Sequence, residues 1–424
     1  MPPRNAYVEL ARDSEAIEVL RPDFGANLER VRHRWFQYKE GFDSAVVDYV
    51  IDASQGDVRH LLDPFGGSGT TAVQAGIRGW HSTSIETNPF VAFVARTKAL
   101  SGNSAQLRRA AAEVANHRPK KISFRLPRDT TLVQRAGLDK WLFNRSVVRR
   151  YEVLRSAIAE ICDEPRASFL TLALVGAMAD VANAKRDGKC WRYKTAWHLR
   201  SYGLSDLDAA FRKRADMIAD DLEHMPTLAA SARILQGDSR NKTTWRTLER
   251  VEHCALITSP PYLNSFDYTD IYRPEMLLLG IGKNSSELRR LRFETLRSHV
   301  QVDWPRGRDS LVPSVQRYVR RLKKRDLWNP KLAEMVNAYF VDLEEVFAQA
   351  VAHLLSESPV AVVVADSAYD GVVIPVPEII AEILGSAGVE ELTVSSLRAT
   401  RGNAHHQLRG GRRMRECLVF GRKS

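Results

Sequence analysis

The sequence lacks the usual features of an exported or membrane-bound protein. Its first residues, MPPRNAYVELARDSE, contain no apolar stretch of the kind found in secretory signals. Its longest apolar run, residues 169–179, is shorter than the roughly 20 residues that a transmembrane helix needs. We therefore expect a cytoplasmic protein with no membrane segment.

Cysteine is scarce, and metal-binding patterns are missing. The four cysteines lie far apart, without a Cys-x-x-Cys pair, which argues against a zinc ribbon and a disulfide framework. None of them follows a proline, which disfavours attack on a ring carbon by a Pro-Cys thiolate. His405 and His406 are adjacent but have no other ligands beside them, so we expect no metal requirement.

The charge is unbalanced toward the basic side. The chain has 62 Lys and Arg against 51 Asp and Glu, which gives a net charge of +11. This excess favours a polyanionic partner, with nucleic acid ahead of a membrane surface. A basic soluble protein without such a partner would have the same composition, so charge alone leaves both interpretations open.

Short apolar segments alternate with helical periodicity. Strands are expected at residues 58–63, 81–86, 233–238, 254–259, 359–366, 392–398 and 415–421. Helices are expected at residues 71–77, 90–99, 333–355 and 377–385. This alternation predicts a doubly wound α/β sheet, in which ligands bind at the carboxyl ends of the strands.

Two long segments interrupt the alternation. Residues 101–232 read as mostly helical, and residues 281–332 contain 14 Lys and Arg against five Asp and Glu. We interpret the first as a helical insertion and candidate target-recognition region, and the second as a basic insertion and candidate DNA-binding region. The α/β catalytic domain would then comprise residues 1–100, 233–280 and 333–424.

A glycine turn, LLDPFGGSGTT, follows the first expected strand. It has no lysine before its Ser/Thr, so it is not a phosphate-binding P-loop. Backbone amides at Gly67 and Gly69, with Glu86 for a ribose diol and Asp238 for a base amine, would suit a nucleoside. Helix capping would explain any one of these carboxylates. Asp63 places a further negative charge in the turn, which favours the cationic S-adenosylmethionine over NAD.

The segment ITSPPYLNSFDY ends the fourth expected strand with a rigid turn. Two prolines forbid helix and donate no backbone N–H. Ser259 Oγ and the Pro260 carbonyl would accept hydrogen bonds from the amine of a base, and Pro261 adds no competing donor. Tyr262 offers a ring face on which a flipped base can stack. Farther along, Asn264, Asp267, Tyr268 and Tyr272 could line the base pocket or bind the methionine end of the donor, although Asp267 is more typical of a helix cap.

The two motifs together resemble those of the exocyclic-amino DNA methyltransferases. That family has a Ser/Asp/Asn-Pro-Pro-aromatic catalytic motif and a DPFxGSGTT donor loop, which stand here as SPPY (Ser259–Tyr262) and DPFGGSGTT (Asp63–Thr71). EGFDSAVVDYVID (Glu40–Asp52) resembles the segment before the donor loop, and IETNPF the second-strand acid. The resemblance covers roughly residues 24–100, 233–275 and 336–424, and neither insertion.

The resemblance implies a seven-stranded, mostly parallel sheet with a reversed last strand and S-adenosylmethionine as cofactor. It implies transfer to a flipped base in double-stranded DNA, as part of restriction-modification with a cognate restriction endonuclease as candidate partner. The Ser-first motif is typical of N4-cytosine members. The implied donor-binding residues are Phe42, Asp63, Phe65, Gly67, Gly69, Thr70, Glu86 and Asp238, and the implied catalytic residues are Ser259, Pro260, Pro261 and Tyr262.

Three basic segments are candidates for DNA contact, residues 184–202, 289–325 and 399–415. A solvated surface explains the first about as well, whereas residues 289–325 are the stronger candidate because their charge is dense and follows directly on the SPPY motif. The third segment lies between the last two expected strands. The candidate contact residues in the other two are Arg192, Lys194, Arg320, Arg321, Lys323, Lys324 and Arg325. Adenine-N6 methylation, RNA base-amine methylation and a catalytically silent DNA-binding module remain alternatives.

Overall fold

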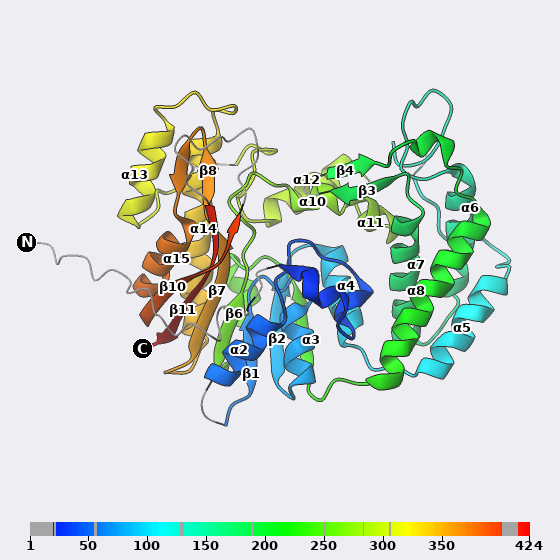
Figure 1. Ribbon diagram of the computed structural model, residues 1–424, viewed down its shortest axis with the longest axis horizontal. Coiled ribbons are helices and arrows are strands. Elements are labelled where there is room, and N and C mark those ends of the chain that lie inside the picture. The colour runs from blue at the N-terminus through cyan, green and yellow to red at the C-terminus, as the bar shows by residue number, and fades with distance from the viewer. Residues whose placement is uncertain are drawn as a thin grey trace, which may run out of the picture.

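The computed structural model describes residues 20, 23–54, 57–127, 131–187, 190–248, 252–282, 284–304, 307–400 and 414–424 (Figure 1). A seven-stranded sheet with the order β10-β11-β7-β6-β1-β2-β5 forms its centre. These strands are β1 (His60–Asp63), β2 (His81–Glu86), β5 (Ala232–Gln236), β6 (Ala255–Thr258), β7 (Pro359–Ala365), β10 (Val389–Thr400) and β11 (Met414–Lys423).

The last strand runs against its neighbours. The strand β11 pairs antiparallel with both β7 and β10, whereas β5, β2, β1, β6 and β7 pair in parallel. The expected doubly wound, mostly parallel fold with a reversed last strand is confirmed. The two final strands are longer than the sequence predicted because their hairpin pairing continues beyond the apolar positions.

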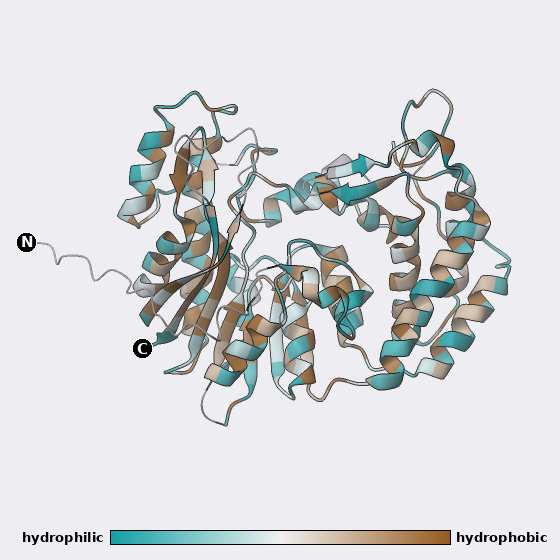
Figure 2. Ribbon diagram, viewed as in Figure 1, coloured by the Kyte–Doolittle hydropathy of each residue, from teal (hydrophilic) through white to brown (hydrophobic). Residues whose placement is uncertain are grey.

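Alternate residues of the central strands face two different cores. Ala361 and Val363 of β7 pack with α2 (Ala45–Ala53) on one face. Val360, Val362 and Val364 pack on the other face with α14 (Leu332–Ala352) and α15 (Val376–Ser386). Since both faces are covered, β6 and β7 are buried at every position, and all their residues except Thr258 are apolar (Figure 2).

The strands of the sheet are connected by helices and, after β7, by a short hairpin. The remaining helices around the sheet are η1 (Phe24–Leu28), η2 (His33–Trp35), α3 (Thr70–Ile77), α4 (Pro89–Ala99), α9 (Lys242–Arg246), α10 (Tyr268–Ile271), α11 (Arg273–Leu278), α12 (Ser285–Glu294) and α13 (Pro313–Leu322). A small hairpin, β8 (Ser367–Tyr369) and β9 (Val372–Ile374), follows β7. No helix in the described ranges is long and apolar enough to cross a bilayer.

Residues 104–224 stand beside the sheet as a helical bundle (Figure 1). It contains α5 (Ser104–Asn116), α6 (Arg145–Ile158), α7 (Glu164–Asp180), η3 (Trp197–Leu199) and α8 (Leu204–His224). A hairpin of β3 (Ala184–Asp187) and β4 (Cys190–Tyr193) also lies within it, which the mostly helical prediction missed. The two residues between these strands in the sequence, Gly188 and Lys189, are a Gly-X pair, which is typical of hairpin turns.

Asp221 of α8 fastens the bundle to the N-terminal segment. Its buried carboxylate accepts hydrogen bonds from Arg32 N (2.7 Å), Trp35 Nε1 (2.8 Å) and the Arg34 guanidinium (2.6 Å). One apolar core then runs without interruption from Trp35 and α4 into the bundle. The segment after η2 is thereby held where it can reach the carboxyl ends of the strands.

Candidate active site

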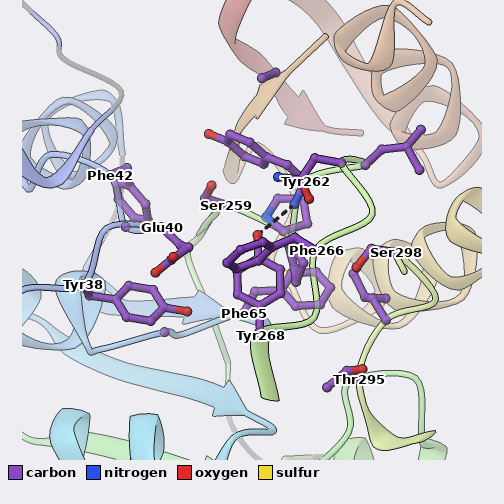
Figure 3. Close-up of a pocket in the computed structure, with 18 of the residues that line it drawn as sticks. Tyr38, Glu40, Phe42, Phe65, Ser259, Tyr262, Phe266, Tyr268, Thr295 and Ser298 are labelled. Carbon is purple, nitrogen blue, oxygen red and sulfur yellow. Dashed lines mark hydrogen bonds between the residues drawn. The ribbon is translucent and has the colours of Figure 1, made fainter. Parts of the chain in front are cut away.

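A cavity of about 550 Å³ lies at the carboxyl ends of the strands. The loops after β1, β2, β5, β6 and β7 line it, together with the facing ends of β10 and β11. Figure 3 shows Tyr38, Glu40 and Phe42 on one side of this cavity and Thr295 and Ser298 on the other, with the Ser259–Phe266 loop between them.

The glycine turn forms one wall of the cavity. Gly67 has a φ of +51°, and a Cβ there would approach the Tyr38 ring to 3.1 Å. Gly69 has a φ of +86° and caps α3, so both positions require the left-handed backbone that glycine adopts readily. Phe65, Gly67 and Thr70 line the cavity, while Gly69 packs against Ala95 of α4.

Asp63 lies behind the turn, and its carboxylate does not face the cavity. It is 1% exposed and accepts hydrogen bonds from Thr71 Oγ1 (2.6 Å), Thr258 Oγ1 (2.7 Å) and Phe65 N (3.0 Å). This corrects the expectation that its charge would meet a cationic ligand. The carboxylate instead ties the glycine turn to the strand that carries the SPPY motif, and burial raises its pKa to about 6.

The raised pKa of Asp63 predicts a pH-dependent stability. The ordinary pKa is 3.8, so the folded state holds a proton between about pH 4 and pH 6 that the unfolded state releases. The free energy of unfolding should therefore fall, by up to about 3 kcal/mol, as the pH rises through this window. Asp63→Asn should flatten this slope in urea titrations at pH 4–7, and the exposed Asp52→Asn should not. Equal slopes in all three proteins would contradict the prediction.

Glu86 and Asp238 both line the cavity, but their hydrogen-bond partners differ in kind. Glu86 accepts a hydrogen bond from Asn88 N (2.7 Å), and burial raises its pKa to about 7. Asp238 is already paired with the Arg240 guanidinium (2.7 Å), which also contacts Asp342. The sequence did not predict this pairing. Both Asp238 oxygens already accept from Arg240, through its backbone N (2.9 Å), Nε (3.0 and 3.1 Å) and Nη2 (2.7 Å), so a ligand amine would have to share these oxygens with Arg240.

The SPPY turn lines the cavity beside the glycine turn, since β6 pairs with β1, and a hydrogen-bond chain orients it. Tyr262 Oη donates to Glu416 Oε1 (2.5 Å), and Arg398 Nη2 approaches Glu416 Oε2 at 2.8 Å. The Ser259 hydroxyl is hydrogen-bonded to Tyr262. Since the Tyr262 proton goes to Glu416, Ser259 donates to Tyr262 and keeps its lone pairs for another partner.

Several residues around the cavity were outside the predicted set. Tyr38, Glu40, Arg398 and Glu416 line it but lie in segments whose sequence shows no catalytic pattern. The EGF tripeptide indicated only Phe42, which does line the cavity. Asn264, Tyr268 and Tyr272 also line it, and Asp267 caps α10 by accepting from Thr269 N (2.9 Å), as the sequence suggested.

The basic residues predicted to contact DNA do not line the cavity. They lie in two separate regions, at the end of α13 and just after it, and in β4 and just after it. Arg320, Arg321, Lys323, Lys324 and Arg325 are exposed at the end of α13, and no ion pair to a described residue involves them. Arg192 of β4 is paired with Asp187 (2.6 Å), and Lys194 Nζ donates to the Asp180 carbonyl (3.2 Å). The third basic segment lies largely outside the described residues, with His405 and His406.

The comparisons with known proteins agree with this geometry. No protein-family model matches the chain. The chain is 24% identical to the Type II methyltransferase M.AvaI of Nostoc sp. over 453 residues, covering 94% of this chain and 88% of the relative. It is 23% identical to the Type II methyltransferase M.BsoBI of Geobacillus stearothermophilus, covering 95% and 87%. Nearly the whole chain is similar to Type II methyltransferases.

Solved structures add little. Two structures of the rRNA methyltransferase aviRa from Streptomyces viridochromogenes align over 97% and 96% of this chain at 10% identity, with TM-scores of 0.30 and 0.34. The two alignments cover 94% and 95% of the aviRa chains. Scores this low support no assignment, and the fold rests on the strand order itself.

Proposed function

We propose that this protein is an S-adenosylmethionine-dependent DNA methyltransferase that modifies the N4 amine of a flipped cytosine in duplex DNA. The observation that carries the proposal is a single cavity lined by the glycine turn, Glu86 and the SPPY turn. The similarity to Type II methyltransferases supports the same reaction class.

The cavity residues fit the donor. Phe42, Phe65 and Val91 give apolar walls for an adenine ring, and Glu86 can accept hydrogen bonds from a ribose diol. Two buried polar atoms at the cavity, Ser68 Oγ and Asn88 Nδ2, have no hydrogen-bond partner among the described residues, as expected where a polar ligand binds. S-adenosylmethionine, when bound, supplies an electrophilic methyl group.

The SPPY turn would prepare the base amine. An exocyclic amine is a weak nucleophile because its lone pair is delocalised into the ring. Ser259 Oγ, whose proton is directed to Tyr262, and the Pro260 carbonyl can accept both amine hydrogens and hold the nitrogen with its lone pair free. The Tyr262 ring, fixed through Glu416, offers a rigid stacking face for the flipped base.

The cytosine assignment rests on the Ser-first form of the motif, and the nearest alternative is adenine N6.

For DNA binding, the exposed cations of α13 and of residues 323–325 are the stronger candidates, because Arg192 and Lys194 are already engaged within the protein. The proposal includes action in the cytoplasm beside a cognate restriction endonuclease, as the motif resemblance implies, and it requires no metal. Within the described residues no group of His, Cys, Asp and Glu is arranged to hold one.

Product analysis tests the proposal. Incubation with labelled S-adenosylmethionine and either plasmid DNA or total RNA, followed by hydrolysis to nucleosides and mass spectrometry, should yield 4-methylcytosine from DNA only. 6-Methyladenine would overturn the base assignment while leaving the enzyme class. Label confined to RNA would overturn the substrate class, and no incorporation with intact donor binding would favour the silent DNA-binding module.

A further inference from the structure

Glu40 is a carboxylate at the cavity that the proposed chemistry has not used. It lies between η2 and α2, and one of its oxygens, Oε2, accepts a hydrogen bond from Tyr272 Oη (2.5 Å). Its other oxygen receives no hydrogen bond from another described side chain. With Asp63 turned away behind the glycine turn, two acids remain near Tyr38: Glu86, which accepts a hydrogen bond from the Gly67 amide, and Glu40.

Tyrosine rings surround this carboxylate. Tyr38 stacks on Tyr272, with ring centroids 5.5 Å apart and planes inclined by 19°. Tyr268, the first residue of α10, is close enough to Glu40 for the two to interact electrostatically. Tyr38 also touches the position of Gly67, so the carboxylate and the rings adjoin the donor loop (Figure 3).

The two cations near Glu40 are each engaged with another group. Arg186 reaches beneath Tyr272, 4.6 Å from its centroid, but it is paired with the buried Glu275. Lys39 is exposed and directs its ammonium to the Arg186 carbonyl (2.7 Å). The charge of Glu40 is therefore only partly compensated, and a carboxylate among aromatic faces is an arrangement that favours a cation.

We propose that Glu40, enclosed by Tyr38, Tyr268 and Tyr272, binds the cationic end of the methyl donor, a role that the sequence had suggested for Asp63. This inference rests on the proposed function. The donor carries two positive groups, a sulfonium and an ammonium. Either positive charge could bind to a carboxylate surrounded by aromatic rings. If the sulfonium is the group bound, methyl transfer removes its charge and weakens the hold on the product.

Binding calorimetry with three ligands tests the site without relying on activity. S-adenosylmethionine carries both charges, S-adenosylhomocysteine only the ammonium, and 5′-methylthioadenosine neither. Glu40→Gln, which keeps the shape of the side chain, should weaken S-adenosylmethionine binding by about 10- to 100-fold and leave 5′-methylthioadenosine unchanged. An equal loss for S-adenosylhomocysteine would assign the ammonium, and an unchanged affinity would assign the sulfonium.

The matched control is Glu294→Gln, a carboxylate at the cavity that lies 3.9 Å from Arg290, and its affinities should equal those of the wild type. The site is overturned if Glu40→Gln binds S-adenosylmethionine as the wild type does. It is also overturned if that variant loses affinity for all three ligands equally, since that indicates general damage. A wild-type protein that binds none of them would overturn the proposed donor itself, and this site with it.

Discussion

Replacing Ser259 with alanine is expected to lower kcat about 100-fold or more while leaving the dissociation constant of S-adenosylmethionine within about twofold. The hydroxyl is one of two acceptors available to the base amine, and loss of one preorganised polar partner typically costs two to three orders of magnitude. Ser259 follows β6 and is not among the residues of the glycine turn or Glu86 that are proposed to bind the donor, so donor binding should persist. Single-turnover methylation of plasmid DNA and calorimetric titration of the donor measure the two quantities.

A serine outside the cavity provides the control. Ser314 begins α13, and its hydroxyl donates to Glu382 at the surface, so Ser314→Ala should methylate at the wild-type rate. A Ser259→Ala variant that also turns over normally would show that the hydroxyl accepts nothing from the substrate. A variant that loses donor binding in parallel would assign Ser259 to the cofactor half of the cavity.

Replacing Asp221 with alanine should lower the free energy of unfolding by about 3–5 kcal/mol. The substitution removes the buried acceptor of Arg32 N and Trp35 Nε1 and leaves the Arg34 guanidinium without its partner. Since residues 38–42 line the cavity directly after this anchor, donor affinity should fall as well. Urea denaturation and donor titration test the two effects together.

The neighbouring residue supplies a matched comparison. Asp220 is half exposed and pairs at the surface with Arg108 and not with the N-terminal segment, so Asp220→Ala should cost less than about 1 kcal/mol. If the two variants unfold at the same urea concentration, the anchor contributes nothing beyond a surface ion pair. If Asp221→Ala is destabilised with donor affinity intact, the bundle does not position the cavity wall.

Much of the fold and the location of the site could be predicted from the sequence. Apolar runs that end in turn residues identified the strands, because buried parallel strands need apolar residues on both faces. The glycine turn and SPPY are contiguous in sequence, so their chemistry could be read directly. The hairpin of β3 and β4 was missed because its alternation of basic and aromatic residues also suits a helix surface.

The side-chain directions could not be predicted. Asp63 was expected to face a ligand, but the two threonines that turn it inward, Thr71 and Thr258, come from different segments. Glu416 accepts a hydrogen bond from Tyr262, which lies 154 positions earlier in the sequence. Arg240 donates to Asp238 from within the same loop. Such contacts depend on tertiary packing that no local pattern encodes.

The position of β11 has a consequence for how the chain acquires its structure. This strand is the last of the seven in the sequence, yet it lies between β7 and β10 and pairs with both. During synthesis, β7 and β10 emerge earlier, and the edges that they later pair with β11 remain unpaired until β11 arrives. The helical bundle, whose contacts are mostly local, can form well before then. We therefore expect completion of the sheet to be the slow folding step, and the interval before it to be when the nascent chain is most prone to aggregate.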